Sequence, residues 1–189
     1  MSPERARLFV GLDLPDVARS LIFRWCANHL SDVAGARWRL IEPQALHVTL
    51  CFLGSRAARD IDSIAAACER AAPRATIELS LGAPVWLPAR RPRAIALTLV
   101  DARHRLSGLQ RAISDTLQAE GWYEPENRPF LAHLTVARLG RGERVRASEL
   151  PSAPPSRAIL CSTVTLYRSH LGSGEARYEA LHTIQLGRG

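Results

Sequence analysis

The stretch Leu46–Gly54 reads LHVTLCFLG. Its apolar residues alternate with His47 and Thr49, a pattern that is typical of a half-buried β-strand. Because residues i and i+2 of a strand point to the same face, the imidazole and the hydroxyl are expected to lie side by side. A lone histidine at the start of a strand is more often packed than functional, so this stretch alone predicts a strand and no chemistry.

A second copy of the pattern changes this interpretation. Residues 133–140 read HLTVARLG and repeat HVTLCFLG at residues 47–54, with histidine, threonine, leucine and glycine at matching offsets. Internal repeats are weighed before single motifs, and an echo that keeps these four residue types is rare by chance. The sequence therefore predicts two equivalent strands. Their polar pairs are His47 with Thr49 and His133 with Thr135.

Two imidazoles and two hydroxyls around one groove suit an in-line displacement at phosphorus. One imidazole takes a proton from the attacking water and the other protonates the departing oxygen, since both titrate near neutral pH. The hydroxyls of Thr49 and Thr135 can donate to the non-bridging oxygens, where charge must be held. No carboxylate lies at ligand spacing in either copy, so the motif predicts no metal.

Outward from these strands, the pattern of elements predicts an α+β fold with antiparallel sheets. Further strands are expected over 7–13, 36–41, 76–82, 93–100, 131–139, 158–170 and 177–186. Helices are expected over 15–29, 60–72 and 102–120, with Gly121 as the C-terminal cap of the last. The segment 83–93, rich in proline and arginine, is expected to be a loop.

The composition is that of a globular protein with an affinity for polyanions. Hydrophobic residues make up 47% of the chain and charged residues 23%, and the net charge of +7 suits a partner such as RNA. All 25 basic residues are arginine, so a GC-rich coding sequence explains the charge equally well. The absence of lysine excludes a nucleotidyl-lysine ligase, a Walker-type phosphate lysine and a Schiff base.

Cysteine spacing and hydropathy indicate which kinds of site and which cellular location to expect. Cys26, Cys51, Cys68 and Cys161 form no CxxC pair, which favours buried thiols over a zinc cluster or a disulfide framework. No apolar run approaches the roughly 20 residues of a membrane span. The N-terminal run LFVGLDL contains Asp13 and is typical of a strand rather than a signal peptide. We expect a cytoplasmic protein with no membrane partner and no cofactor.

Taken together, these motifs resemble the two-histidine (2H) phosphoesterases, specifically the bacterial LigT/ThpR-type RNA 2′,3′-cyclic phosphodiesterases. The resemblance covers nearly the whole chain and rests on four segments: RLFVGLDLP, LHVTLCFLG, GWYEPENRPFLAHLTVARLG and LYRSHLGSGEARYEAL. It implies a single bilobal domain over residues 1–189, with two pseudo-symmetric lobes. Their antiparallel sheets would flank a central groove, with the helices on the outside.

The resemblance also implies an activity and a direction for the chemistry. RNA 2′,3′-cyclic phosphate ends, or cyclic nucleotides, would be hydrolysed to 2′-phosphomonoesters without metal or ATP. Apart from the resemblance, we expect the protein to be a monomer. His47 would be the proton donor to the leaving 3′-oxygen and His133 the proton acceptor. Reversible 2′–5′ ligation of tRNA halves and trimming of RNA 3′ ends stay open. So does a non-catalytic RNA-binding module that uses the histidines only as phosphate contacts.

Arg138 matches an arginine that binds phosphate in this family. It lies five residues after His133, so an ideal strand would point it to the opposite face, and only a bulge or a strand end would bring it back. The family often has proline before the second histidine, where this chain has Ala132. We expect that difference to alter backbone stiffness without loss of activity.

Two phenylalanines complete the candidates. Phe9 is a candidate for substrate binding because an aromatic ring can stack on a terminal base, although a core position is equally compatible with LFV. Phe52 takes the place of Arg138 in the first copy, and its strand parity predicts a core position.

Overall fold

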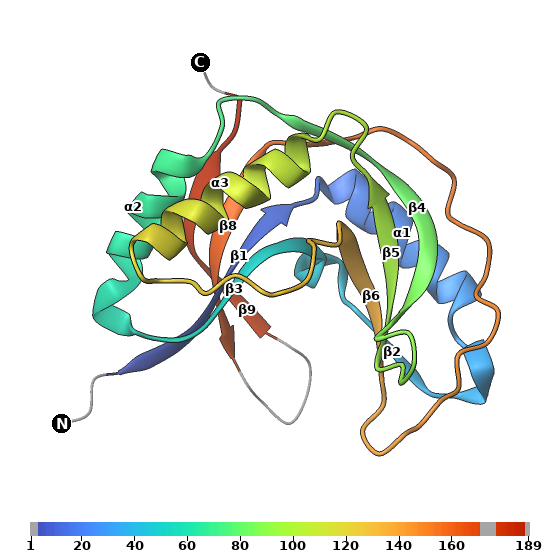
Figure 1. The fold of residues 1–189 in the computed structure, drawn as a ribbon. Helices are drawn as coiled ribbons and strands as arrows, with labels where there is room; N and C mark the ends of the chain where they lie inside the picture. The colour runs from blue at the N-terminus through green and yellow to red at the C-terminus, as the bar shows by residue number, and fades with distance from the viewer. Residues whose placement is uncertain (1–3, 171–176, 188–189) are drawn as a thin grey trace.

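Two antiparallel sheets stand side by side under an outer layer of helices (Figure 1). The computed structural model describes residues 4–170 and 177–187. The four-stranded sheet has the order β3-β1-β8-β9, and the five-stranded sheet has the order β2-β6-β5-β4-β7. Helices α2 and α3 cover the four-stranded sheet, whereas α1 lies against the five-stranded one. The expected α+β fold class is confirmed.

The elements keep close to their expected positions. The strands are β1 (Arg5–Asp13), β2 (Trp38–Leu40), β3 (His47–Ala57), β4 (Ile77–Leu87), β5 (Ala94–Val100), β6 (His133–Leu139), β7 (Ile159–Cys161), β8 (Thr163–His170) and β9 (Arg177–Gln185). The helices are α1 (Asp16–His29), α2 (Ile61–Ala71) and α3 (Arg105–Ala119).

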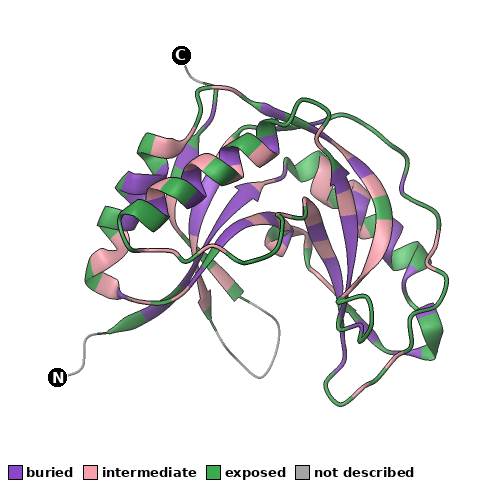
Figure 2. Cartoon of the chain, in the orientation of Figure 1, coloured by how far each residue is buried: buried purple, intermediate pink, exposed green. Residues whose placement is uncertain are grey.

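Helix α3 shows how the sequence pattern becomes packing. Its apolar stripe is fully buried and faces the sheet, while the rest of its surface is largely exposed (Figure 2). Burying one large aliphatic side chain stabilises a fold by roughly 1.5–3 kcal/mol, so this stripe contributes substantially to the packing of α3 on the sheet. The helix ends where expected, because Gly121 adopts the left-handed conformation with φ of +77°. The stripe consists of Leu106, Leu109, Ile113 and Leu117.

The expected loop at 83–93 is wrong in its first half, since β4 continues to Leu87. The register of β4 on β5 shifts between Leu81 and Pro84, which marks a bulge around Gly82. Beyond this point β7 no longer pairs with β4, because their pairing covers only Ile77–Leu79. Pro84 therefore lies where β4 is a sheet edge, and an edge strand tolerates a missing N–H.

The single strand expected over 158–170 is two strands that belong to different sheets. β7 pairs with β4 in the five-stranded sheet, and β8 pairs with β1 and β9 in the four-stranded one. The break falls at Ser162, whose carbonyl accepts a hydrogen bond from the Leu186 N–H (2.7 Å). Because hydropathy does not report which neighbour a strand pairs with, the sequence pattern could not separate the two.

The four thiols lie in the core, as their spacing predicted. Cys26, Cys51, Cys68 and Cys161 are all buried and free, and burial raises the pKa of each thiol to about 12. They are therefore packing residues rather than nucleophiles. In the part of the chain that the structure describes, no helix has the length and apolar character needed to cross a membrane.

Candidate active site

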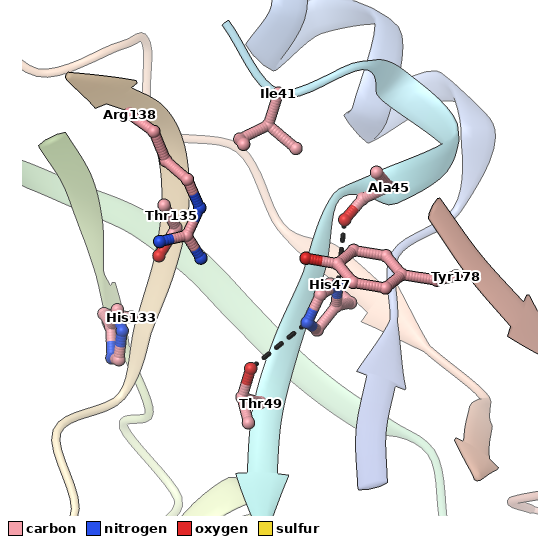
Figure 3. A pocket seen from close by; sticks show the side chains of 8 residues that line it. All are labelled: Ile41, Ala45, His47, Thr49, His133, Thr135, Arg138 and Tyr178. Atoms are coloured by element: carbon pink, nitrogen blue, oxygen red, sulfur yellow. Dashed lines mark hydrogen bonds between the residues drawn. The ribbon is translucent and has the colours of Figure 1, made fainter. Parts of the chain in front are cut away.

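The two copies of the repeat face each other across a small pocket (Figure 3). His47 and Thr49 project from β3, and His133, Thr135 and Arg138 project from β6 on the opposite side. Five of the six predicted site residues are thus brought together. The remaining lining residues are Ile41, Ala45 and Tyr178.

A bulge in β6 brings Arg138 to the face of His133. Along β5, Ala96 pairs with Thr135 and the next residue, Ile95, pairs with Ala137, so Val136 is an extra residue in β6. One extra residue reverses the alternation of side chains beyond it. Arg138 therefore points into the pocket although it lies five residues after His133, and the bulge required by its spacing is present.

The same bulge occurs in the first copy. Val10 of β1 pairs with Cys51 and Gly11 pairs with Thr49, which leaves Leu50 as the extra residue of β3. The alternation is reversed beyond it, so Phe52 joins the face of His47 and is 42% exposed. The expectation that Phe52 is a core residue is therefore wrong, and the reason is the bulge that parity counting ignored.

The carbonyl of each bulge residue accepts a hydrogen bond from a donor outside the strand pair that contains the bulge. The Val136 carbonyl accepts from the Ile41 N–H (2.9 Å). The Leu50 carbonyl accepts a long hydrogen bond from Gln110 Nε2 on α3 (3.5 Å). Since a buried unpaired carbonyl is costly, these donors help to hold the two bulges in place.

Both imidazoles are oriented by the backbone two residues upstream. His47 Nδ1 donates to the Ala45 carbonyl, and His133 Nδ1 donates to the Leu131 carbonyl, each at 2.8 Å. These bonds place the proton of the neutral ring on Nδ1 and leave Nε2 free to exchange protons. On His47, Nε2 accepts from the Thr49 hydroxyl at 3.1 Å.

The protonation of His47 is set by its surroundings. Burial lowers the pKa of His47 to about 4, the Ala45 carbonyl opposes this shift, and the charge of Arg138 adds to it. In the protein alone the His47 imidazole is therefore neutral at physiological pH. Its Nε2 acts there as a hydrogen-bond acceptor.

The Phe9 ring is enclosed in the protein and does not lie open to stack on a terminal RNA base. Only 3% of its surface is exposed, and its ring lies 4.7 Å from the His47 ring and 5.1 Å from that of Tyr167. It packs beside the imidazole on the same face of the sheet. The aromatic of this cluster that lines the pocket is Tyr178 of β9, whose ring meets His47 edge-on at 5.1 Å. No repeat marks Tyr178 in the sequence, so only the pairing of β9 could reveal it.

A half-buried carboxylate accepts hydrogen bonds from this cluster. Asp13 accepts from the Tyr167 hydroxyl and from the Thr165 hydroxyl, each at 2.6 Å. Arg19 lies 3.9 Å from the same carboxylate. Burial, followed by the bond to Asp13, raises the pKa of Tyr167, which therefore stays a donor. Among residues 4–170 and 177–187, no group of three or more side chains is arranged to hold a metal ion.

Comparison with known proteins shows which family this chain resembles. The family model described as "LigT like Phosphoesterase" matches residues 12–95. E. coli LigT in complex with 3′-AMP superposes with a TM-score of 0.79 at 28% identity, covering 98% of this chain and 100% of that one. In sequence over residues 12–95, and in fold over nearly its whole length, this chain is similar to the LigT-like phosphoesterases.

Other proteins similar to this chain carry related descriptions or share its fold. RNA 2′,3′-cyclic phosphodiesterase of Bacillus subtilis (strain 168) is 24% identical, over 96% of this chain and 97% of its own. The Geobacillus stearothermophilus protein of the same description is also 24% identical, over 97% of this chain, which spans 58% of that relative's length. The Thermus thermophilus protein TT0787 shares the fold, with a TM-score of 0.76 at 23% identity over 96% of this chain and 98% of that one.

Proposed function

We propose that this protein is an RNA 2′,3′-cyclic phosphodiesterase that yields 2′-phosphomonoester ends without metal or ATP. The observation that carries the proposal is the facing of two imidazoles, each with Nδ1 bonded to a carbonyl and Nε2 available, across one pocket. The proposal is also supported by the two 24%-identical relatives, each of which is described as an RNA 2′,3′-cyclic phosphodiesterase.

The reaction needs one proton to be removed and one to be supplied. Water attacks the phosphorus of the cyclic ester and passes a proton to His133 Nε2, as the P–O3′ bond breaks and His47 Nε2 protonates the 3′-oxygen. Thr49, Thr135 and Arg138 hold the non-bridging oxygens, where hydrogen bonds to the developing charge count most. The product keeps its phosphate on the 2′-oxygen.

Substrate binding gives His47 its proton in this scheme. The pKa of His47 is about 4 in the protein alone, so an acid at neutral pH must gain a proton as the substrate enters. The anionic cyclic phosphate supplies the reason, because a negative charge beside an imidazole raises its pKa. If His47 stayed neutral with a phosphate ligand bound, the two histidines would exchange roles.

A turnover assay tests the function. The protein is incubated with 2′,3′-cyclic AMP and with an oligoribonucleotide ending in a 2′,3′-cyclic phosphate, in EDTA and without ATP, and the products are identified by ³¹P NMR. We expect 2′-phosphate, with loss of at least about 10²-fold in His47→Ala and in His133→Ala, as is usual for removal of an acid or base. His182→Ala, on β9 outside the pocket, is the matched control.

The outcomes separate the related activities. Tight RNA binding without turnover of either substrate would leave only the RNA-binding module. Joining of a 5′-hydroxyl RNA end in place of hydrolysis would indicate 2′–5′ ligation. Release of nucleotides from RNA whose 3′ end carries no cyclic phosphate would indicate trimming of RNA 3′ ends. Hydrolysis that survives both histidine variants would overturn the mechanism.

A further inference from the structure

A second hollow lies on the four-stranded sheet, beyond the catalytic pocket. Strands β1, β3 and β8 line it, and most of its polar side chains are basic. We call it the basic hollow. It is lined by Arg5, Arg7, Phe52, Ser55, Arg168 and His170, among others.

The basic hollow and the catalytic pocket share one face of this sheet. Residues that pair directly across an antiparallel ladder point to the same side. Phe52 pairs with Phe9, and the Phe9 ring touches the His47 ring. On the other flank Ser169, which lines the hollow, pairs with Tyr178, which lines the pocket. Helices α2 and α3 cover the opposite face, and no helix of the described residues lies on this one (Figure 1).

The chemistry of the hollow combines a cation with an exposed ring. The Arg7 guanidinium carbon lies 4.7 Å from the centroid of the Phe52 ring, and Phe52 is 42% exposed. No carboxylate within the described residues forms an ion pair with Arg7. Arg5 is held in place by Ser55, through Nε to Oγ (2.8 Å) and Nη2 to the carbonyl (2.7 Å).

The far side of the hollow is more nearly neutral. Arg168 pairs with Glu4 at 3.1 Å, and His170 lies 2.9 Å from Glu179. The uncompensated positive charge is therefore concentrated on β1, beside the aromatic ring. Stacking rings interleaved with cations are how proteins hold single-stranded nucleic acid without reading its sequence.

We propose that the basic hollow binds the single-stranded RNA segment that precedes the cyclic end, with a base on Phe52 and backbone phosphates beside Arg7 and Arg5. This inference rests on the proposed function. Phe52 lies five residues along β3 from His47, roughly 16 Å at about 3.3 Å per residue. At about 3.4 Å per stacked nucleotide, that distance corresponds to roughly five nucleotides. A mononucleotide is too short to reach the hollow, and a hexamer is long enough.

The experiment compares the two substrate lengths. kcat/KM is measured for 2′,3′-cyclic AMP and for a single-stranded hexaribonucleotide ending in a 2′,3′-cyclic phosphate, and the readout is their ratio. We expect the hexamer to be preferred by about tenfold or more, since one base–aromatic stack contributes about 1–3 kcal/mol. Phe52→Leu and Arg7→Ala should each lower the ratio by about fivefold or more, whereas Phe52→Trp should keep it.

Two controls separate binding from folding. Arg111→Ala removes the same charge from the exposed side of α3 and should leave the ratio unchanged. Direct binding of a labelled hexamer with a 3′-phosphate, followed by fluorescence anisotropy, needs no turnover. For Arg7→Ala, the slope of log affinity against log salt should fall by about 0.7, the value for one single-strand phosphate contact.

The possible failures are distinguishable. If neither substrate is hydrolysed, the proposed function fails. If both are hydrolysed with equal kcat/KM, or if Arg7→Ala and Arg111→Ala change the ratio alike, the hollow does not bind RNA and the proposed function stands. A ratio that Phe52→Trp lowers as much as Phe52→Leu would also overturn the stacking role.

Discussion

The ionisation of His47 links the pocket to the stability of the fold. Burial holds its pKa at about 4, whereas an unfolded histidine titrates near about 6.5. The unfolded chain therefore takes up a proton first as the pH falls, and the folded state loses stability between about pH 6.5 and pH 4. The loss reaches roughly 2–3 kcal/mol at the acid end. Urea unfolding at several pH values should show a smaller acid loss for His47→Gln than for the unchanged protein.

Titration by NMR examines the same residue directly. In the protein alone the His47 imidazole should stay neutral down to about pH 4. Saturation with 2′-AMP should move its midpoint upwards by at least about one pH unit, because the phosphate anion favours the charged ring. A midpoint that the ligand leaves in place would contradict the role of His47 as acid.

Gly11 leaves the space that the His47 ring occupies beside β1. A Cβ at this position would lie 3.3 Å from His47 Cδ2, closer than ordinary contact. Gly11→Ala should therefore tilt the imidazole and lower kcat by about tenfold or more, since catalysis depends on sub-ångström placement. Gly108→Ala, at a helical glycine with open space around it, is the control. Equal activity of the two variants would show that the ring tolerates the contact.

At this scale the sequence predicted more of the site than of its surroundings. The repeat located both histidines and both threonines because the chemistry requires the same residue types at the same offsets in both strands. Tyr178 and the enclosed position of Phe9 were not predictable, since both follow from which strands are neighbours. The roles of the site residues stay predictions until the variants are assayed.

Among the elements, the paired bulges account for most differences between expectation and structure. Strand parity assumes a ladder without insertions, but β3 and β6 each contain an extra residue directly after the motif threonine, at Leu50 and Val136. Arg138 and Phe52 both turn to the pocket face for this reason. The β7–β8 break at Ser162 has a related cause, because sheet membership depends on partners that lie far away in sequence.

Helix α3 offers a test with two glycines of opposite effect. Gly108 lies inside the helix with nothing within 4 Å of an added Cβ, and Gly121 follows its end with φ of +77°. Gly108→Ala should raise the free energy of unfolding by about 0.5–1 kcal/mol through helix propensity. Gly121→Ala should lower it by about 1 kcal/mol through left-handed strain, and Gly121→Asn by less. Urea denaturation measures both.

Over the whole molecule, the two sheets are interleaved along the chain. The backbone passes from one sheet to the other between β1 and β2, between β2 and β3, between β3 and β4, and between β7 and β8. No contiguous fragment therefore contains a complete sheet without strands of the other. We propose that residues 1–189 fold as one cooperative unit.

Pulsed thiol labelling in urea tests this cooperativity. Cys51 is buried on β3 of the four-stranded sheet, and Cys161 is buried on β7 of the five-stranded one. If the sheets unfold together, the two thiols become reactive with the same midpoint, as two-state behaviour requires. Separate midpoints would mean that each sheet is an independent unit. Peptide-resolved mass spectrometry provides the readout, and prior labelling in strong denaturant calibrates the intrinsic rate of each thiol.

The interleaving of the two sheets also affects how RNA substrates would bind and how products would leave. Because the backbone crosses between the two sheets several times, we expect the two walls of the pocket to move little relative to each other. RNA ends would then arrive and depart at rates governed by diffusion and charge. A long or folded tail behind the reacting terminus would meet no closing step that it could obstruct.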